Sequence, residues 1–356
     1  MTLDELRQNI DELDGQIVQL LNDRARCAQR IGELKRHTDS PIYVPEREQA
    51  VFQRVVARNE GPLEDSAIES IYREVISAIR TLEKAVTVAF LGPKDTFSHM
   101  AALKVFGSSA EYHPLASFAD VFSEVEHGRI DYGVVPVESS MGGSVSDTLD
   151  HFIVSNLQIV NEVELHITQN LMANCSLDDV KRVYSKDNAL MQCRNWLRSN
   201  LPRAELIEVS STAEAARRAS SEEGASAIAS RLAAQTYNLE ILAERVEDAP
   251  HNFTRFFVLG RQHVRPTGND KTALIISVQD KPGALYNLLL PFASEGINLS
   301  RIESRPSKLR AWEYVFFIDL LGHVEDEKVK LVLEQVAAHA KQVKILGSFP
   351  RAKRPD

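Results

Sequence analysis

The segment NFTRFF, residues 252–257, places an amide, a hydroxyl and a guanidinium at the entrance of an apolar run that continues into Val-Leu-Gly. In an extended chain successive side chains point to opposite faces, so Asn252 and Thr254 share one face while Arg255 lies on the other. Two interpretations are open for this pair. The polar groups cap the backbone at the start of a strand, or the neighbouring amide and hydroxyl take part in chemistry.

A second set of chemically notable residues lies in the first 35 positions, where apolar side chains recur at 3, 6, 10, 13, 17, 20, 28, 31 and 34. Spacings of three and four predict one long helix with a packing seam. Roughly 33 residues make a rod of about 50 Å, so we expect a partner chain to cover it. Arg24 stands on the seam, and Lys35 points in nearly the same direction. Cations there indicate either an internal ion pair or a buried anion pocket.

From residue 86 to about 263, short apolar runs alternate with helical patterns, as is typical of an α/β sheet. The junctions repeat a strand, a Ser or Thr cluster and a helix, as in VAFLGPKDTFSHMA, YGVVPVESSMGGSVSDTLD and RVYSKDNALMQC. Hydroxyls and helix N-termini gathered at strand ends suit a small anion in a cleft between two lobes. Gly142 and Gly143 would let a carboxylate approach the backbone. Helix capping alone is the other interpretation, and it is the better one for SSTAEAA.

The regions on either side have different patterns. Two shorter helices, at about 45–58 and 66–83, complete an all-helical first segment. From residue 271 the apolar runs predict the order βαββαβ, which is a small ferredoxin-like module. Pro282 and Gly283 begin its first helix, whose free N–H groups could hold a carboxylate.

Composition restricts the function further. The 356 residues carry a net charge of −9, which argues against nucleic-acid binding, and no apolar run reaches the roughly 20 residues of a membrane span. Cys27, Cys175 and Cys193 are scattered without metal-ligand spacing. We expect a cytoplasmic protein of two or three domains.

Together these segments resemble, in order, a helical chorismate mutase, a prephenate dehydratase and an ACT regulatory domain. The motifs GPKDTFS, VPVESS, NFTRF, GALYN and ESRPS stand in the order found in the bifunctional P-proteins of phenylalanine biosynthesis. The resemblance implies an all-α domain at 1–85, a two-lobed, periplasmic-binding-protein-like α/β domain at 86–265 and a ferredoxin-like α+β domain at 271–349. No cofactor and no metal are implied.

For the mutase, an isomerase, the resemblance places Arg7 and Arg24 on the carboxylates of chorismate. It places Lys35 and Glu83 at the ether oxygen and Arg47 in the pocket. The rearrangement to prephenate requires a clamp for the reactive conformer and cations where charge develops, with no nucleophile. One arginine is expected from the partner chain.

Two mutase positions deserve separate expectations. Glu83 has to be protonated to donate a hydrogen bond, so we expect a mutase rate that falls as the pH rises. Val44 departs from relatives that carry Asp there, and Glu46 is a candidate to compensate.

For the dehydratase, a lyase, the resemblance makes Thr254 the catalytic hydroxyl, which acts on the departing ring hydroxyl while the ring carboxylate leaves as carbon dioxide. Arg255, on the opposite strand face, is expected to support the strand more than the substrate carboxylates. The remaining prephenate-binding residues implied are Thr96, Ser98, Glu138, Ser139, Ser185, Gln192 and Asn252.

The dehydratase segment also departs from the family pattern. Ser139 stands where Asn is usual, Asp95 where Gly is usual, and residues 185–188 read SKDN where relatives have SHPQ. A hydroxyl at 139 replaces an amide that donates and accepts, and Asp95 adds negative charge near a dicarboxylate site. We expect a working dehydratase, with a site that only binds prephenate or phenylalanine as the alternative.

The third segment implies phenylalanine as effector, bound between paired ACT modules, so that a ligand at a module interface favours one quaternary arrangement. A purely structural dimerisation module is the alternative. The effector residues implied are Gly283, Ala284, Leu285, Asn298, Glu303, Ser304, Arg305 and Pro306.

The sequence thus predicts a homodimeric or larger bifunctional enzyme that converts chorismate to prephenate and then to phenylpyruvate, under feedback inhibition by phenylalanine. Two rival hypotheses remain. In one, the middle domain decarboxylates prephenate without loss of water. In the other, the chain is a phenylalanine-responsive regulatory protein with an inactive dehydratase domain.

Overall fold

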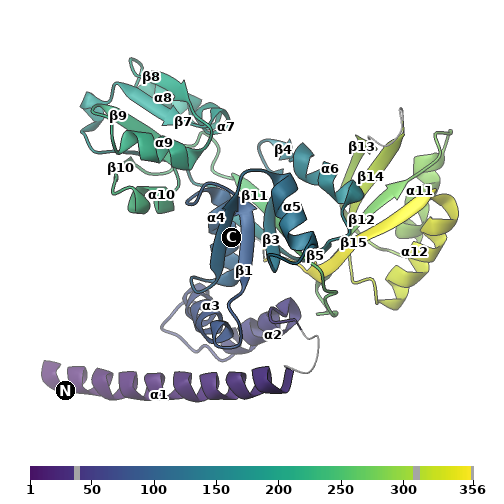
Figure 1. Ribbon diagram of the computed structural model, residues 1–356, viewed down its shortest axis with the longest axis horizontal. Helices are drawn as coiled ribbons and strands as arrows, with labels where there is room; N and C mark the ends of the chain where they lie inside the picture. The colour runs from purple at the N-terminus through teal and green to yellow at the C-terminus, as the bar shows by residue number, and fades with distance from the viewer. Residues whose placement is uncertain (36–40, 308–312, 354–356) are drawn as a thin grey trace. The chain divides into compact units, whose positions relative to one another are not determined.

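A computed structural model of the chain describes residues 1–35, 41–307 and 313–353 (Figure 1). The chain divides into two compact units, which we describe separately. The first contains Met1–Thr87 and Val105–Glu111, and the second contains Val88–Lys104 and Tyr112–Asp356. Within the described residues, no helix is long and apolar enough to cross a membrane.

The first unit is built from three helices, α1 (Leu3–Lys35), α2 (Pro45–Val56) and α3 (Asp65–Thr81). Pro45 starts α2 at a position where its missing N–H costs nothing. Tyr43 and Phe106 pack with ring centroids 4.8 Å apart, and Ile76 and Ile79 of α3 are buried. The core of this unit therefore lies around α3 and not along α1.

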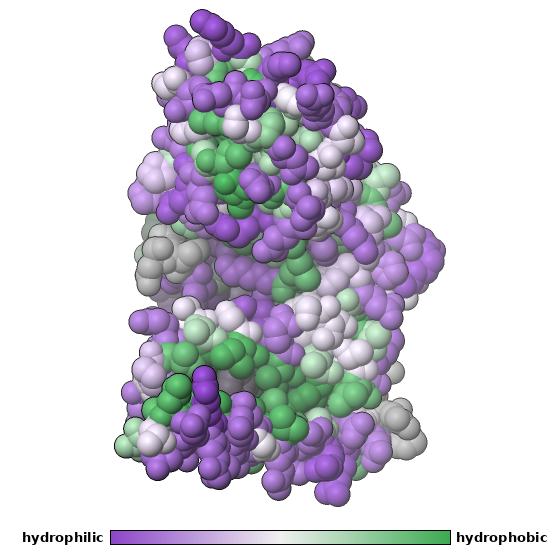
Figure 2. All heavy atoms as spheres, turned by 90° about the vertical axis from the view of Figure 1, so that its left-hand side faces the viewer, coloured by the Kyte–Doolittle hydropathy of each residue, from purple (hydrophilic) through white to green (hydrophobic). Residues whose placement is uncertain are grey.

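Helix α1 keeps its apolar seam exposed. Figure 2 shows hydrophobic side chains gathered over the helical unit, in the lower part of the view. Ile10 and Leu13 on the seam of α1 are 57% and 55% exposed. Burial of such side chains is worth about 1.5–3 kcal/mol each, so the single chain leaves much of the stabilisation of α1 unused.

The first lobe of the second unit is a mixed sheet. Its strand order is β2-β1-β3-β11-β5, with β4 paired to β3. The strands are β1 (Thr87–Leu91), β2 (Glu111–Leu115), β3 (Tyr132–Ser139), β4 (Gly143–Ser144), β5 (Gln158–His166) and β11 (Phe253–Gly260). The helices of this part are α4 (Phe97–Phe106), α5 (Phe118–Glu126) and α6 (Ser146–Val154).

The second lobe is a five-stranded sheet in the order β10-β6-β9-β7-β8. Its strands are β6 (Asn170–Ala173), β7 (Arg182–Ser185), β8 (Glu205–Glu208), β9 (Ala225–Ala229) and β10 (Glu240–Ala243). Its helices are η1 (Leu177–Asp179), α7 (Asp187–Gln192), α8 (Arg194–Asn200), α9 (Thr212–Ala219) and α10 (Arg231–Thr236). The chain enters this lobe after β5 and leaves it before β11, and the Ile167 N–H donates to the Asn252 carbonyl at 2.7 Å where the two passages meet.

The C-terminal part has the order β12 (Asp270–Ser277), α11 (Ala284–Ser294), β13 (Leu299–Pro306), β14 (Tyr314–Leu321), α12 (Glu327–His339) and β15 (Gln342–Pro350). The sheet order β13-β14-β12-β15 is that of a ferredoxin-like fold. The expected three-part fold of helical, two-lobed α/β and βαββαβ segments is confirmed.

Strand β15 lies against β5 of the first lobe at very close range. A Cβ atom on Gly347, which has φ of +149°, would lie 2.3 Å from the Ile159 carbonyl oxygen. Only glycine fits both the backbone angle and the space. The C-terminal sheet and the first lobe consequently share a tightly packed contact.

Candidate active sites

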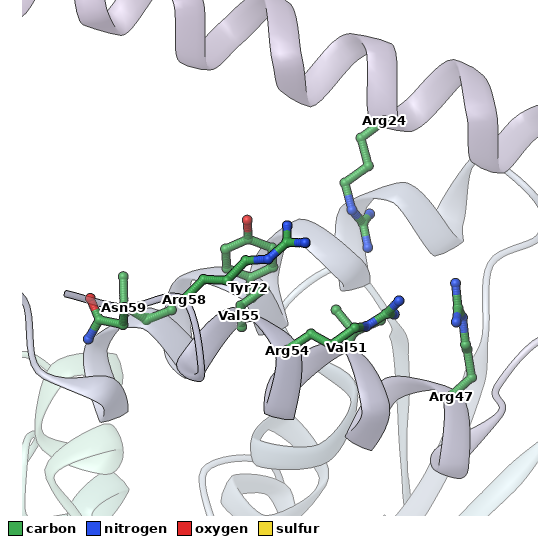
Figure 3. A pocket seen from close by; sticks show the side chains of 9 residues that line it. Arg24, Arg47, Val51, Arg54, Val55, Arg58, Asn59 and Tyr72 are labelled. Atoms are coloured by element: carbon green, nitrogen blue, oxygen red, sulfur yellow. The ribbon is translucent and has the colours of Figure 1, made fainter.

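A cavity of about 450 Å³ opens between the three helices of the first unit (Figure 3). Arginine is the dominant residue type in its lining, and no acidic side chain is among the lining residues that the structure describes. The lining consists of Arg24, Arg47, Val51, Arg54, Val55, Arg58, Asn59, Ile68 and Tyr72. Four guanidinium groups in one cavity suit a small ligand with more than one carboxylate.

Helix α2 and the turn that follows it supply three of these arginines. Arg47 and Arg54 are seven residues apart, which places them on one face of α2, and Arg58 follows in the turn after the helix. Figure 3 shows Arg24 extending from α1 towards this face. Arg54 and Arg58 were not predicted from the sequence, although their spacing from Arg47 carried the signal.

Arg7 cannot share a small ligand with Arg24 of the same chain. The two residues stand 17 positions apart on one helix, which corresponds to about 26 Å along its axis. Arg7 instead lies 3.5 Å from Asp4 on the exposed helix surface. If both arginines bind one substrate, Arg7 comes from another copy of the chain.

The other residues expected at the mutase site have different positions. Lys35 ends α1, and its side chain lies outside the described residues. Glu83 is half-buried and packs on Gly32 of α1, where a Cβ atom would lie 3.0 Å from the Glu83 Cγ. Val44 is the N-cap of α2 and offers no side-chain cap, and Glu46 follows in the first turn.

A buried ion pair not expected from the sequence joins α2 to α3. Glu48 Oε1 lies 2.7 Å from Arg80 Nη2, with both side chains largely buried. The Arg80 guanidinium also lies 5.3 Å from the Tyr43 ring centroid. Burial raises the pKa of Glu48 to about 7, although Arg80, Arg73 and Arg24 each favour its charged form.

In the second unit, Thr254 stands between two strands of the first lobe. It is the cross-strand partner of Ser139 on β3 and of Leu165 on β5. Directly opposed residues in an antiparallel pair have side chains on the same face, about 5 Å apart. Both residues are half-buried and lie near the ends of interior strands, so their side chains stand side by side at an accessible end of the sheet.

The turn after Ser139 is fixed by hydroxyl hydrogen bonds. The Ser140 Oγ accepts from the Phe253 N–H at 2.9 Å and donates to the His251 carbonyl at 3.0 Å. The Ser139 Oγ accepts from the N–H groups of Met141 and Gly142 at 3.4 and 3.3 Å. Ser139 thus has a local role in shaping the turn, which an asparagine side chain would fill differently.

An amide bridge connects the two lobes beside Thr254. The Asn252 Nδ2 donates to the Gln192 Oε1 at 3.0 Å, and Gln169 Nε2 donates to the same oxygen at 3.3 Å. The Asn252 Oδ1 and the Gln169 Oε1 are buried without a hydrogen-bond partner in the structure. Unsatisfied buried acceptors of this kind call for a donor, and a ligand hydroxyl or water can supply it.

The loop that contains Asp95, just before α4, contacts the second lobe from the first. Asp95 has a positive φ of 67°, in the left-handed region that favours glycine. Its carbonyl accepts from the Ser230 Oγ of the second lobe at 3.2 Å, and its N–H donates to the His99 Nδ1 at 3.1 Å. Burial lowers the pKa of His99. Thr96 begins α4, with its hydroxyl donating to the Pro93 carbonyl at 3.1 Å.

Two residues expected to bind prephenate are engaged elsewhere. The Ser185 Oγ is fully buried and donates to the Ile228 carbonyl at 2.7 Å. Arg255 is buried and forms ion pairs with Glu162, at 2.6 Å, and with Asp319 of β14. The hydroxyl of Ser185 serves the second-lobe sheet, and Arg255 ties β11 to the C-terminal sheet.

The residues expected to bind an effector fall into two groups. Gly283, at φ of +80°, is the N-cap of α11, and Leu285 in the first turn is 39% exposed, with Ala284 beside it. Along β13, burial alternates, so that Ser304 and Pro306 face outward with the nearby Asn298 exposed. Glu303 and Arg305 instead point to the first lobe, where the Arg305 Nη2 contacts Asp150 of α6 at 3.0 Å.

Known protein families match three successive parts of the chain. The chorismate mutase type II family matches residues 6–84, the prephenate dehydratase family residues 88–264 and the ACT domain family residues 272–338. The bifunctional chorismate mutase/prephenate dehydratase of Aquifex aeolicus is 49% identical over 355 residues, covering 98% of both chains. That of Stutzerimonas stutzeri is 46% identical over 357 residues, also covering 98% of both. The chain belongs to the bifunctional chorismate mutase/prephenate dehydratase family.

A solved structure supports the domain identity at the level of fold. Prephenate dehydratase from Arthrobacter aurescens, in complex with L-Phe, has a TM-score of 0.70 and 36% identity, and the match covers 75% of this chain and 90% of that one. Within the family frame, the arginine cavity lies in the mutase segment, Thr254 in the dehydratase segment and β13 in the ACT segment.

Proposed function

We propose that the chain catalyses two consecutive reactions, chorismate to prephenate in the helical unit and prephenate to phenylpyruvate in the two-lobed domain. The observation that carries the dehydratase proposal is the pairing of Thr254 with Ser139 beside the Asn252–Gln192 bridge between the lobes. The four-arginine cavity supports the mutase proposal. The proposed domains are 1–85, 86–265 and 271–349.

The mutase step needs no covalent intermediate. Chorismate carries two carboxylates, which Arg24 and Arg47 and the partner's Arg7 would hold, so that the reacting carbons are brought together. Lys35 and a protonated Glu83 would stabilise the ether oxygen as its bond to the ring breaks. The four arginines that line the cavity support this use.

The dehydratase step balances as prephenate plus one proton giving phenylpyruvate, carbon dioxide and water. The Thr254 hydroxyl hydrogen-bonds to the ring hydroxyl as its C–O bond breaks and it leaves as water. The bond from the ring to its carboxylate breaks at the same stage, and its electron pair completes the aromatic ring. Glu138, Ser139, Gln192, Asn252, Thr96 and Ser98 are the proposed contacts.

The regulatory proposal is inhibition by phenylalanine at the ACT segment, in a homodimer of cytoplasmic location. The L-Phe complex of the Arthrobacter relative supports the effector. The outward residues of β13 and the N-terminus of α11 offer the proposed contacts, and the exposed seam of α1 supports a dimer. Glu303 and Arg305 are proposed to act through their contacts with the first lobe.

Supplying chorismate to the purified protein and following prephenate and phenylpyruvate separately tests the proposal. We expect both products in succession, with the second suppressed by added phenylalanine. Accumulation of prephenate alone would remove the dehydratase assignment and favour the regulatory alternative for the middle domain. A decarboxylated product that retains its hydroxyl, recognised by its non-aromatic ultraviolet spectrum, would instead indicate a decarboxylase.

A further inference from the structure

A hairpin in the first lobe connects the dehydratase residues to the regulatory strand. Strand β3 ends with Glu138 and Ser139, the chain turns at Gly142 and Gly143, and Glu138 pairs with Ser144 of β4. The Ser144 Oγ donates to the Glu303 carboxylate of β13. The hairpin that carries two proposed prephenate contacts is therefore held from the other side by the ACT segment.

Arg301 is the centre of this contact. Its side chain is only 7% exposed, and its Nη2 donates to the Ser144 Oγ at 2.8 Å and to Glu303. Its Nε lies 3.8 Å from the Glu138 Oε2, and Glu138 remains 42% exposed on the other side. One buried guanidinium thus joins two carboxylates and the hairpin hydroxyl, and a charge in such a position restricts the side chains around it.

The outer face of β13 is open while its inner face is occupied. Arg301, Glu303 and Arg305 point towards the first lobe, whereas Ser300, Ile302 and Ser304 are exposed. Because side chains alternate along a strand, a ligand that shifts β13 from its outer face moves these inner side chains with it. Arg301 is the inner side chain that reaches Glu138.

We propose that Arg301 is a positioning residue of the dehydratase reaction, which holds Glu138 and the β3–β4 hairpin in their working geometry and transmits phenylalanine binding at β13 to them. This inference rests on the proposed dehydratase function and extends it to the path of its regulation. Arg301 acts through Glu138 and does not itself touch prephenate.

The attachment of the ACT segment does not depend on Arg301. Arg255 and Lys271 form buried ion pairs with Asp319 and Glu162 across the same two domains. The Lys344 Nζ donates to three backbone carbonyls at the end of α6 and after it. Removing the Arg301 charge should therefore leave the domains joined, so that an effect on the dehydratase reports the hairpin and not dissociation.

The test compares Arg301→Met, Arg301→Lys and Asp150→Asn with the wild-type chain. Asp150→Asn is the control for the dehydratase rate alone, because it removes the Arg305 ion pair between β13 and the first lobe and leaves the contacts of Arg301 with Ser144 and Glu138 in place. For each protein, the dehydratase kcat and KM, its inhibition by phenylalanine and the mutase rate are measured on the same sample. The mutase rate reports the folding of the helical unit, and a denaturation curve of each protein reports the folding of the second unit.

We expect Arg301→Met to lower dehydratase kcat/KM by about tenfold or more and to weaken inhibition by a similar factor, with the mutase unchanged. Arg301→Lys should restore part of both effects, and Asp150→Asn should keep the dehydratase kcat/KM within about twofold of wild type. In a Glu138→Gln background, Arg301→Met should add little, because coupled residues are not additive.

Three outcomes would overturn the inference: an unaffected dehydratase in Arg301→Met, an equal loss of dehydratase kcat/KM in Asp150→Asn, or full additivity with Glu138→Gln. Failure of the dehydratase proposal itself looks different, since the wild-type chain would then form no phenylpyruvate at all.

Discussion

Thr254 occupies a strand whose two faces have separate tasks. Its own face carries the hydroxyls and the inter-lobe amide bridge, while the face of Arg255 is locked by ion pairs to Glu162 and Asp319. The ion pairs of the opposite face hold the strand in place, and the Thr254 hydroxyl takes no part in them. Rigid elements position catalytic groups more accurately than loops do.

The Thr254→Ala variant tests this residue directly. We expect dehydratase kcat to fall by about 10²–10⁴, the usual contribution of a proton-donating group, while KM for prephenate changes little. Thr254→Ser keeps the hydroxyl and should retain much of the rate. A Thr254→Ala enzyme with wild-type kcat would show that the hydroxyl has no catalytic part.

Among the residues that depart from the family pattern, Asp95 has the clearest conformational cost. A non-glycine residue at φ of 67° is strained, and its carboxylate stands in a loop that faces a site for a dicarboxylate. We expect Asp95→Gly to lower KM for prephenate severalfold and to stabilise the domain by about 1 kcal/mol through relief of strain. Steady-state kinetics and denaturation of wild type and variant would measure both, and a higher KM would show that Asp95 assists binding.

Glu83 provides a pH test for the mutase. Glutamine donates a hydrogen bond at every pH, whereas glutamate does so only when protonated. Glu83→Gln should therefore raise the mutase rate at neutral pH and flatten its decline from acid to neutral conditions. Measuring the mutase rate of both proteins as a function of pH tests this expectation. A wild-type rate that does not change with pH would exclude a role for the protonated carboxyl.

At the scale of secondary-structure elements, some features of the sites were predictable because they follow from periodicity. Strand alternation separated Thr254 from Arg255 correctly, and the spacing of Arg47 and Arg54 placed them on one face of α2. Capping also explained SSTAEAA, since the Ser211 Oγ accepts from the Glu214 N–H at 3.1 Å and caps α9.

Other features depend on contacts that a sequence does not reveal. The Ser185 hydroxyl donates a hydrogen bond to a backbone carbonyl 43 residues away, and Arg255 forms an ion pair with Glu162, 93 residues away. Pairing at such separations is set by tertiary packing, and propensity or periodicity carries no information about it. The Arg301 contact with the hairpin belongs to the same class.

Helices α2 and α3 are joined by the Glu48–Arg80 ion pair, and the stability of this unit depends on pH through Glu48. Because the pKa of Glu48 is raised from 4.5 to about 7, the folded unit binds this proton more tightly than the unfolded chain does. The proton on Glu48 therefore adds to the free energy of unfolding. This contribution is present in full below about pH 4.5 and is lost as the pH rises to about 7, and its upper limit is about 3 kcal/mol.

Hydrogen exchange of the α3 amides at pH 5 and pH 8, corrected for intrinsic rates, would detect this loss of protection. Glu48→Gln should remove the dependence, whereas Glu46→Gln on the same helix should keep it. Equal pH dependence in wild type and Glu48→Gln would assign the effect to another group.

At the scale of the whole molecule, we propose that a second chain covers α1. Its seam is exposed, and the axial separation of Arg7 from Arg24 prevents one chain from completing the proposed mutase site. A two-fold pair of chains would place Arg7 of each against the cavity of the other. The interface would then be a part of the active site and not only an attachment.

Mixing an Arg7→Ala chain with an Arg24→Ala chain tests this arrangement. Each variant alone should have a mutase rate reduced by about 10² or more, because a charged contact to substrate is lost. In randomly mixed dimers one site in four carries neither change, so about a quarter of the wild-type rate should return. No recovery after co-expression would show that both arginines serve the same chain's site or none.

If a second chain covers the seam of α1, the two proposed reactions should depend differently on the pairing of chains. All the proposed prephenate contacts come from one chain, whereas the proposed mutase site needs two. On dilution, the chorismate reaction should decline per chain as free subunits accumulate, while the prephenate reaction persists. The ratio of the two rates would then report the fraction of paired chains, without any label or physical separation.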